Sequence, residues 1–272
     1  MLIAQITDTH IVDKNEHWLS EPLTRIRERL IQVISYLNAL SPRPDVVLLT
    51  GDVTDKGTPA AYDHFRELTK SLSIPLYLIP GNHDCRQEMR KAFSNQPYMP
   101  NEGFIQYVVD DYPVRLIGLD THVEGEAYGH ICEERFTWLQ QIINRGDEKP
   151  TLIFMHHAPV KTGTKIFDAI NCLADSHLEH LISKQNNFLG IIAGHYHQLC
   201  LTTYGGKTCF IAPSVAPISF FAHPQDDYVT ALELEDPAIT LHKWQGGSVM
   251  ASHVIRLKEQ HHRIDWKLIK RN

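Results

Sequence analysis

The chain lacks the features that mark several large classes of protein. Its five cysteines are odd in number and none belongs to a Cys-x-x-Cys pair, which disfavours a disulfide scaffold and favours a reducing cytoplasm. The first residues, MLIAQITD, have no basic segment, and their apolar stretch is too short for a signal peptide. No apolar run approaches the roughly 20 residues of a membrane-spanning helix. We therefore expect a cytoplasmic protein that does not bind a membrane.

Acidic residues slightly outnumber basic ones. The 272 residues carry a formal net charge of −6, so the backbone of a nucleic acid polymer is not an expected partner. The chain has no internal repeat and no low-complexity segment, and its length fits one large domain or one domain with a small appendage. Histidine, by contrast, is abundant, with 17 in the chain. Metal ligation is one reason for a chain to be rich in histidine.

Strand-like and helix-like segments alternate along the first 200 residues. Residues 45–52, DVVLLTGD, form a nearly continuous apolar run, which is typical of a strand covered on both faces. Residues 23–40 carry apolar side chains at helical spacing, and Thr58 and Pro59 suit the N-cap and the first position of a second helix. The alternation predicts an α/β domain built of layered sheets and helices.

We divide the chain at residue 200. Residues 1–200 are predicted to form the core that carries the chemistry, and residues 201–272 are predicted to be β-rich, because Gly, Pro and Asp split them into short strand-like pieces. The second part is expected to complete a sheet, and it could add a small cap or an oligomer contact.

Polar residues follow five of the predicted strands, each time directly after an apolar run. The five segments are Asp8-Thr9-His10, Gly51-Asp52, Gly81-Asn82-His83-Asp84, His156-His157 and Gly194-His195-Tyr196-His197. Taken alone, each is more typical of a turn than of a ligand site. In open α/β sheets, however, ligands bind outside the carboxyl ends of the strands, so all five segments could converge on one place.

The donors in these segments outnumber the ligands of a single catalytic metal. Such a site uses about three protein ligands, whereas the segments offer Asp8, His10, Asp52, Asn82, His156, His195 and His197. This set suits two metals about 3.5–4 Å apart with a bridging carboxylate. Imidazole and carboxylate ligands favour Fe, Mn, Zn or Co. The histidines outside the five segments are expected to lie at the surface or in packing.

In this order, the five segments resemble the motifs of the calcineurin-like metallophosphoesterases, which read D-x-H, G-D, G-N-H-D/E, H and G-H-x-H. The resemblance spans most of the first 200 residues. It implies a four-layer αββα sandwich, here with a small β-rich C-terminal cap. Within the family, the chain is most similar to the class III cyclic nucleotide phosphodiesterases and the bacterial glycerophosphodiesterases.

The resemblance also implies a role for each residue. The first metal would be held by Asp8, His10, Asp52 and His197, and the second by Asp52, Asn82, His156 and His195. His156 is chosen over His157 because the first histidine of such a pair usually ligates. His83 would act as general acid beside the leaving group, and Asp84 would orient the imidazole of His83.

The activity implied by the resemblance is hydrolysis of a small phosphodiester. Two divalent metals lower the pKa of a bridging water, and the resulting hydroxide attacks phosphorus in line, while Asn82 and His83 bind and stabilise the phosphoryl oxygens. We expect 3′,5′-cyclic AMP to be the first candidate substrate, with glycerophosphodiesters or nucleotide pyrophosphates as alternatives. A scaffold without catalytic activity is a third interpretation, although a scaffold need not retain every metal donor.

Substrate contacts are expected within residues 212–228, APSVAPISFFAHPQDDY. Phe220, Phe221 and His223 could line a pocket for the base or the alcohol of the substrate. The two phenylalanines could equally pack in the core, or form a contact in a homo-oligomer. The sequence leaves these interpretations open.

Overall fold

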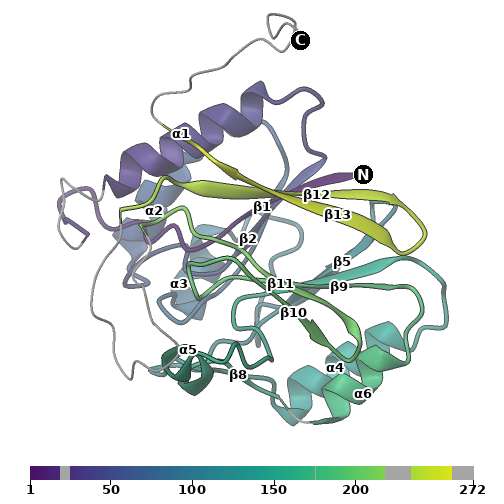
Figure 1. Cartoon of the computed structure of the whole chain (residues 1–272). Helices are drawn as coiled ribbons and strands as arrows, with labels where there is room; N and C mark the ends of the chain where they lie inside the picture. The colour runs from purple at the N-terminus through teal and green to yellow at the C-terminus, as the bar shows by residue number, and fades with distance from the viewer. Residues whose placement is uncertain (19–24, 175, 218–233, 259–272) are drawn as a thin grey trace, which may run out of the picture.

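The computed structural model describes residues 1–18, 25–174, 176–217 and 234–258 (Figure 1). Phe220, Phe221 and His223, which were expected to contact the substrate, lie outside the described residues. No helix in the described part of the chain is both long enough and apolar enough to cross a membrane.

The first sheet has five strands in the order β13-β12-β1-β2-β3. Its strands are β1 (Leu2–Ile6), β2 (Val46–Thr50), β3 (Leu76–Ile79), β12 (Ala238–Gly246) and β13 (Val249–Arg256). β1, β2 and β3 are parallel, whereas β12 runs antiparallel to β1 and β13 antiparallel to β12. The carboxyl ends of the three N-terminal strands therefore lie along one edge of this sheet.

The second sheet has six strands in the order β10-β11-β9-β7-β5-β4. Its strands are β4 (Tyr107–Val109), β5 (Arg115–Leu119), β7 (Thr151–Met155), β9 (Phe188–Ala193), β10 (Cys200–Tyr204) and β11 (Lys207–Ile211). The four central strands are parallel, and an antiparallel strand closes each side. A separate short ladder pairs β6 (Gly129–His130) with β8 (Cys172–Leu173).

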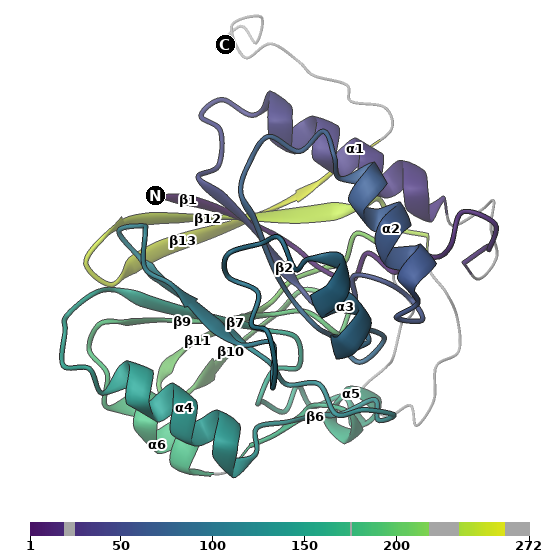
Figure 2. The same ribbon diagram turned by 180° about the vertical axis from the view of Figure 1, so that it is seen from behind.

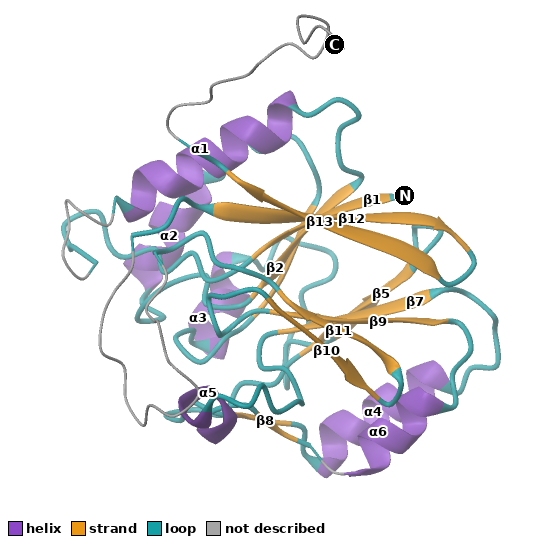
Figure 3. Cartoon of the chain, in the orientation of Figure 1, coloured by secondary structure: helices purple, strands orange, loops and turns teal. Residues whose placement is uncertain are grey.

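Helices cover the outer faces of the two sheets. The described helices are α1 (Ile26–Ala39), α2 (Pro59–Leu68), α3 (Arg86–Ala92), α4 (Glu133–Ile143), α5 (Lys165–Ala169) and α6 (Ser176–Ser183). Figures 1 and 2 show α1 and α2 on the outer side of the first sheet and α4 and α6 on the outer side of the second. The two sheets, orange in Figure 3, lie between these helices. This arrangement confirms the predicted α/β class and is consistent with the expected αββα order of layers.

The interior between the sheets is apolar, but specific polar contacts join them. Every residue of β2, β7 and β9 is buried, as expected for strands covered on both faces. Gln5 of β1 donates through Nε2 to the main-chain oxygen of Ala193 at the end of β9, at 2.9 Å. Tyr107 of β4 donates its hydroxyl to the main-chain oxygen of Leu78 in β3, at 2.7 Å. These bonds fix how the sheets are stacked, and so how their strand ends face one another.

Two expectations about individual segments can be compared with the structure. The helix predicted to begin at Pro59 does so, and the hydroxyl of its N-cap, Thr58, accepts a bond from the main-chain N–H of Ala61 at 3.3 Å. The described strands after residue 200 extend both sheets, because β10 and β11 join the second and β12 and β13 the first. The boundary at residue 200, a cap and an oligomer contact stay predictions.

Candidate dinuclear metal centre

The polar segments at the ends of β1, β2, β3, β7 and β9 meet at one edge of the two-sheet sandwich. Main-chain bonds join them directly: the N–H of Asp8 donates to Gly51 at 3.1 Å, and the N–H of Gly194 donates to His156 at 3.1 Å. A side-chain bond joins the first and last segments, because Asp8 Oδ2 accepts from the N–H of His195 at 3.1 Å. All seven predicted metal ligands except the half-buried Asn82 are buried.

The backbone at the predicted ligands has an unusual conformation. Six non-glycine residues in the described ranges have positive φ, and five of them are predicted ligands: Asp8 (54°), His10 (44°), Asp52 (49°), His195 (75°) and His197 (56°). A left-handed conformation costs an L-residue roughly 1–2 kcal/mol, and such strain gathers at functional sites. The turns take the chain out of strand geometry, so residues two apart, such as His195 and His197, can face the same centre.

Gly51 shows why the strand ends can approach so closely. Its φ is +90°, and a Cβ atom added to it would lie 2.3 Å from Nδ1 of His156. Only glycine combines this backbone angle with this contact. The end of β2 can therefore pack directly on the imidazole that follows β7.

The first group of donors consists of Asp8, His10, Asp52 and His197. One donor atom of each lies within 4.8 Å of the others. Nε2 of His197 is 3.3 Å from Asp8 Oδ1 and 3.1 Å from Nε2 of His10. Asp8 Oδ1 is buried and has no hydrogen-bond partner in the described part of the chain. A buried carboxylate oxygen next to an imidazole nitrogen, which in turn lies 3.1 Å from a second imidazole nitrogen, fits a divalent cation.

The second group is built around His156. Its Nε2 lies 3.1 Å from Asn82 Oδ1 and 3.3 Å from Asp52 Oδ2. The same oxygen of Asp52 lies 3.6 Å from Nε2 of His10, in the first group. Asp52 therefore reaches both groups, as a bridging carboxylate must.

Each histidine of the two groups is held by the ring nitrogen that does not face the centre. The carbonyl oxygens of Thr50, Ile170 and Pro217 accept bonds from His156 Nδ1 (2.7 Å), His195 Nε2 (3.0 Å) and His197 Nδ1 (3.4 Å). A carbonyl oxygen only accepts, so the bonded nitrogen must carry the proton. The other nitrogen of each ring faces the centre, which is the arrangement found at metal-ligating histidines.

The charges of the site favour a cation. Burial alone would raise the pKa of Asp8, but His197 and His156 lower it to about 2. Burial also opposes the charge of Asp52, yet His156 and His83 hold its pKa well below the ordinary value. Burial lowers the pKa of His195 to about 3. Ionised carboxylates and a neutral imidazole are the forms that ligate metals.

The structure corrects the expected role of Asp84. Its buried carboxylate accepts bonds from the main-chain N–H groups of Gly81 (3.0 Å), Val53 (3.1 Å) and Thr54 (3.1 Å) and from the hydroxyl of Tyr62 (2.9 Å). The expectation that it orients the imidazole of His83 is wrong, because His83 Nδ1 donates instead to the main-chain oxygen of Asp55 at 2.9 Å. Asp84 ties the loop after β3 to the loop after β2, and so fixes Asn82 relative to Asp52.

Asp55 is a site residue that the sequence analysis missed. Its Oδ1 accepts from His10 Nδ1 at 3.1 Å and from the indole Nε1 of Trp18 at 2.7 Å, while its main-chain oxygen accepts from His83. Its only sequence signal is its position three residues after Asp52, in GDVTD. Unlike the predicted ligands, Asp55 does not directly follow a predicted strand. It connects a predicted metal ligand with the predicted general acid.

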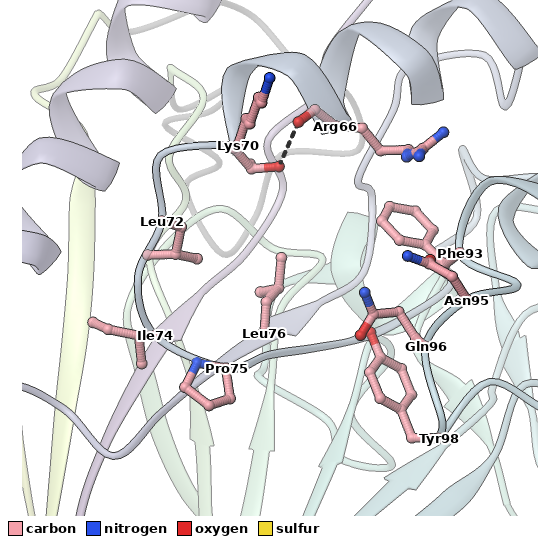
Figure 4. A pocket seen from close by; sticks show the side chains of 11 residues that line it. Arg66, Lys70, Leu72, Ile74, Pro75, Leu76, Phe93, Asn95, Gln96 and Tyr98 are labelled. Atoms are coloured by element: carbon pink, nitrogen blue, oxygen red, sulfur yellow. Dashed lines mark hydrogen bonds between the residues drawn. The ribbon is translucent and has the colours of Figure 1, made fainter.

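Two cavities differ in their relation to this centre. One, of about 420 Å³, is bordered by Asn82 and His83 and lined further by polar residues that include Arg86, Gln87 and Glu124. The other, of about 320 Å³, lies between the end of α2 and the start of β3, where Lys70 and Tyr98 project from its walls (Figure 4). The second cavity contains none of the predicted ligands. Of these two cavities, only the first borders predicted residues of the centre.

Two sheets packed face to face, with a shared carboxylate and flanking imidazoles at their strand ends, define a hydrolase of the dinuclear metal class. A family model described as calcineurin-like phosphoesterase matches residues 1–199. The chain belongs to this family, whose members use a dinuclear divalent metal centre. The recognition made from the five motifs is confirmed.

Relatives of similar length carry phosphodiesterase names. The chain is 33% identical to a probable glycerophosphodiester phosphodiesterase of Arcobacter nitrofigilis, over 93% of this chain and 92% of that protein. It is 30% identical to a glycerophosphodiester phosphodiesterase of Enterobacter lignolyticus, over 90% and 88%. It is 27% identical to a 3′,5′-cyclic adenosine monophosphate phosphodiesterase of Escherichia coli, over 81% and 78%. The chain is thus a metal-dependent phosphoric diester hydrolase.

Solved structures agree on the fold. A purple acid phosphatase from yellow lupin superimposes with a TM-score of 0.68 at 13% identity, covering 95% of this chain and 52% of that one. A dimetal phosphatase from Danio rerio superimposes with a TM-score of 0.61 at 17% identity, covering 94% and 99%. At these identities the likeness establishes the fold alone.

Proposed function

We propose that the enzyme hydrolyses small phosphodiesters, with glycerophosphodiesters as the first candidate substrates and 3′,5′-cyclic AMP as the second. The observation that carries the reaction class is the position of one Asp52 oxygen, 3.6 Å from Nε2 of His10 and 3.3 Å from Nε2 of His156, so that it reaches both groups of donors. The sequence motifs alone placed cyclic AMP first. The similarity to glycerophosphodiester phosphodiesterases over nine-tenths of the chain supports the reverse order.

The metals would be held as the motifs imply. Asp8, His10, Asp52 and His197 would hold the first, and Asp52, Asn82, His156 and His195 the second. Two bound divalent cations supply Lewis acidity at the phosphoryl oxygens and make a water nucleophilic near neutral pH. Nitrogen and oxygen donors support Fe, Mn, Zn or Co as the metals.

His83 is proposed to give a proton to the departing alcohol. It is the one predicted catalytic residue that is exposed, with 41% of its side chain accessible, and it borders the larger cavity. Burial lowers the pKa of His83, but Asp52 and the bond to Asp55 outweigh this and raise it above the ordinary value. Because Asp55 fixes Nδ1, Nε2 is the nitrogen left to deliver the proton.

The cavity beside His83 supports a polar alcohol as leaving group. Its walls include the side chains of Gln87, Glu124 and Lys56, which can donate to or accept from hydroxyl groups. No aromatic ring other than histidine lines it within the described ranges, so these walls offer no aromatic face on which a nucleobase could stack. Phe220, Phe221 and His223 remain predicted substrate contacts outside those ranges.

Cytoplasmic location, absence of polymeric partners and a homo-oligomer also remain proposals.

Parallel assays test the proposed function. The purified enzyme with added Mn²⁺ is incubated with glycerophosphocholine, 3′,5′-cyclic AMP and bis(p-nitrophenyl) phosphate, and an Asp8→Ala variant purified in the same way serves as control. We expect hydrolysis of all three by the wild type, with the highest kcat/KM for glycerophosphocholine. Two metals bound per chain but no hydrolysis of any diester would contradict the proposal.

A further inference from the structure

A further strand end lies beside the candidate centre. β5 is parallel to β7, and its last residue, Leu119, is paired with Met155, which directly precedes His156. The residues that follow, Asp120-Thr121-His122, repeat the D-T-H of Asp8-Thr9-His10. In the described part of the chain, however, His122 belongs to no group of convergent metal donors.

We propose that His122 is a substrate-contacting residue whose imidazole binds a hydroxyl group of the departing alcohol. The inference rests on the proposed diester hydrolysis and deepens it, because it names the chemical class of the leaving group. It is carried by the cavity that His122 borders, by a ring nitrogen without a partner and by the contacts that hold the residue in place.

His122 borders the same cavity as the proposed proton donor. Asn82, His83 and His122 are all among the lining residues of the cavity of about 420 Å³. Asn82 is a predicted ligand of the second metal, and His83 is proposed to protonate the departing oxygen. An alcohol that leaves beside His83 therefore enters the space that His122 lines.

The imidazole of His122 is enclosed but unsatisfied. Only 3% of the residue is exposed, and Nδ1 is buried without a hydrogen-bond partner among the described residues. Burial and the charge of Arg86 lower the pKa of His122 to about 4, so the ring is neutral near pH 7. A neutral imidazole has one nitrogen that donates and one that accepts. A hydroxyl group, which also does both, is a complementary ligand.

The backbone of His122 is fixed on both sides of this ring. Its N–H donates to Oδ1 of the buried Asp120 at 2.9 Å. Its carbonyl oxygen accepts from Nη1 of Arg135 at 3.0 Å and also from the guanidinium of Arg86. A binding group that is held before the ligand arrives loses little freedom on binding.

Arg86 links His122 to the segment that carries the proposed proton donor. It is the first residue of α3 and comes three residues after His83. Its Nε and Nη2 donate to the two carboxylate oxygens of Asp120 at 2.7 and 3.0 Å. The loop after β3 and the loop after β5 are therefore clamped together, which fixes the imidazole of His122 relative to that of His83.

The charges of the cavity favour a neutral hydroxyl group over a second phosphate. Two basic side chains of the wall are already paired: Arg86 with both oxygens of Asp120, and Lys56 with Glu16 at 2.9 Å. A second phosphate group would have to compete with these carboxylates. A polyol such as glycerol can bond to His122 without breaking either pair.

Kinetics with two substrates test the proposal. In glycerophosphoglycerol both alcohols are glycerol, whereas the nitrophenyl groups of bis(p-nitrophenyl) phosphate carry no hydroxyl. Both are assayed with added Mn²⁺ and wild type, His122→Phe or His122→Ala. We expect the ratio of the two kcat/KM values, glycerophosphoglycerol over bis(p-nitrophenyl) phosphate, to fall about 5- to 150-fold in both variants, because a substrate hydroxyl loses its partner. A ratio within about twofold of the wild type would overturn the proposal.

Two more variants complete the comparison. His122→Asn keeps one donor and one acceptor, so its ratio should lie between those of His122→Phe and the wild type. His130→Phe is the matched control, since His130 is exposed in β6 and does not line the cavity. Its ratio should equal that of the wild type. The three substitutions of His122 differ in volume and polarity, so the test does not depend on one of them folding by circular dichroism.

Metal content separates a substrate contact from a structural role. Each folded variant should retain two metals per chain by elemental analysis, and loss of metal or an equal fall in kcat/KM on both substrates would overturn the proposal. A wild type that hydrolyses neither substrate would refute the proposed diester hydrolysis. A wild type that hydrolyses only bis(p-nitrophenyl) phosphate would refute the hydroxyl-bearing leaving group, whereas an unchanged ratio in the variants would refute only the role of His122.

Discussion

His83 Nδ1 donates to the main-chain oxygen of Asp55 at 2.9 Å. The carboxylate of the same Asp55 accepts from His10, a predicted ligand of the first metal, and from the indole of Trp18. One residue therefore orients both the predicted proton donor and a metal ligand. The two functions are coupled through Asp55, in the loop after Asp52.

Replacing Asp55 by asparagine should weaken the first metal site and slow turnover together. The amide oxygen can still accept one bond, but it lacks the charge that holds His10 Nδ1 as a donor and makes the imidazole more basic. We expect metal affinity and kcat to fall by about 10- to 100-fold each, measured by calorimetry and by steady-state kinetics. Asp63→Asn, on the exposed face of α2, is the control and should match the wild type. An Asp55→Asn enzyme with wild-type metal affinity would show that the contact to His10 is incidental.

Replacing His83 by alanine should separate metal binding from chemistry. His83 makes its side-chain bond to Asp55 and belongs to neither of the two ligand groups around Asp52, so both metals should remain. A missing proton donor matters most when the leaving alcohol has a high pKa. We expect kcat to fall roughly 100- to 10,000-fold for glycerophosphocholine and much less for bis(p-nitrophenyl) phosphate. Equal losses on both substrates would argue that His83 binds the phosphoryl group and does not act as an acid.

The stability of the metal-free protein should depend on pH through His242. This buried histidine of β12 donates through Nε2 to Gln5 at 3.0 Å, and its Nδ1 lies 2.8 Å from the hydroxyl of Ser252. Burial lowers the pKa of His242 to about 3, whereas an unfolded chain takes up the proton near pH 6.5. The unfolded state therefore binds more protons between these values, and stability falls as the pH drops below about 6.5.

Urea unfolding in the presence of EDTA measures this dependence. His242→Gln should flatten the loss of stability between pH 6.5 and 4.5 by up to about 1.4 kcal/mol per pH unit. His253→Gln, at an exposed position of the neighbouring strand β13, is the control and should keep the wild-type slope. The same slope in His242→Gln and wild type would mean that His242 is protonated in the folded state.

Much of the centre could be predicted because its signals are local. Each ligand directly follows an apolar strand, and parallel strands bring their carboxyl ends to one edge, so the five segments carry both identity and position. The helix after Thr58 was predictable for the same reason, since an N-cap and a proline act within one turn.

The parts that were missed depend on contacts between distant segments. Asp55 gains its role from His10 and Trp18, which approach it only in the folded chain. The carboxylate of Asp84 was assigned to its sequence neighbour, but three main-chain N–H groups and a tyrosine hydroxyl occupy it. The strand β13 was not predicted, because its residues are exposed or half-buried and show no strong alternation.

The left-handed backbone at five of the ligands has a consequence for how the centre would fill. These turns are fixed by contacts within the protein, such as the bonds from the N–H groups of Asp8 and His195, and involve no ion. The free-energy cost of the left-handed turns is therefore met when the chain folds. Metal binding then requires little reorganisation of the backbone. An arriving cation would need only to shed water and displace protons, so the rate of uptake should follow pH and ion hydration more closely than any motion of the chain.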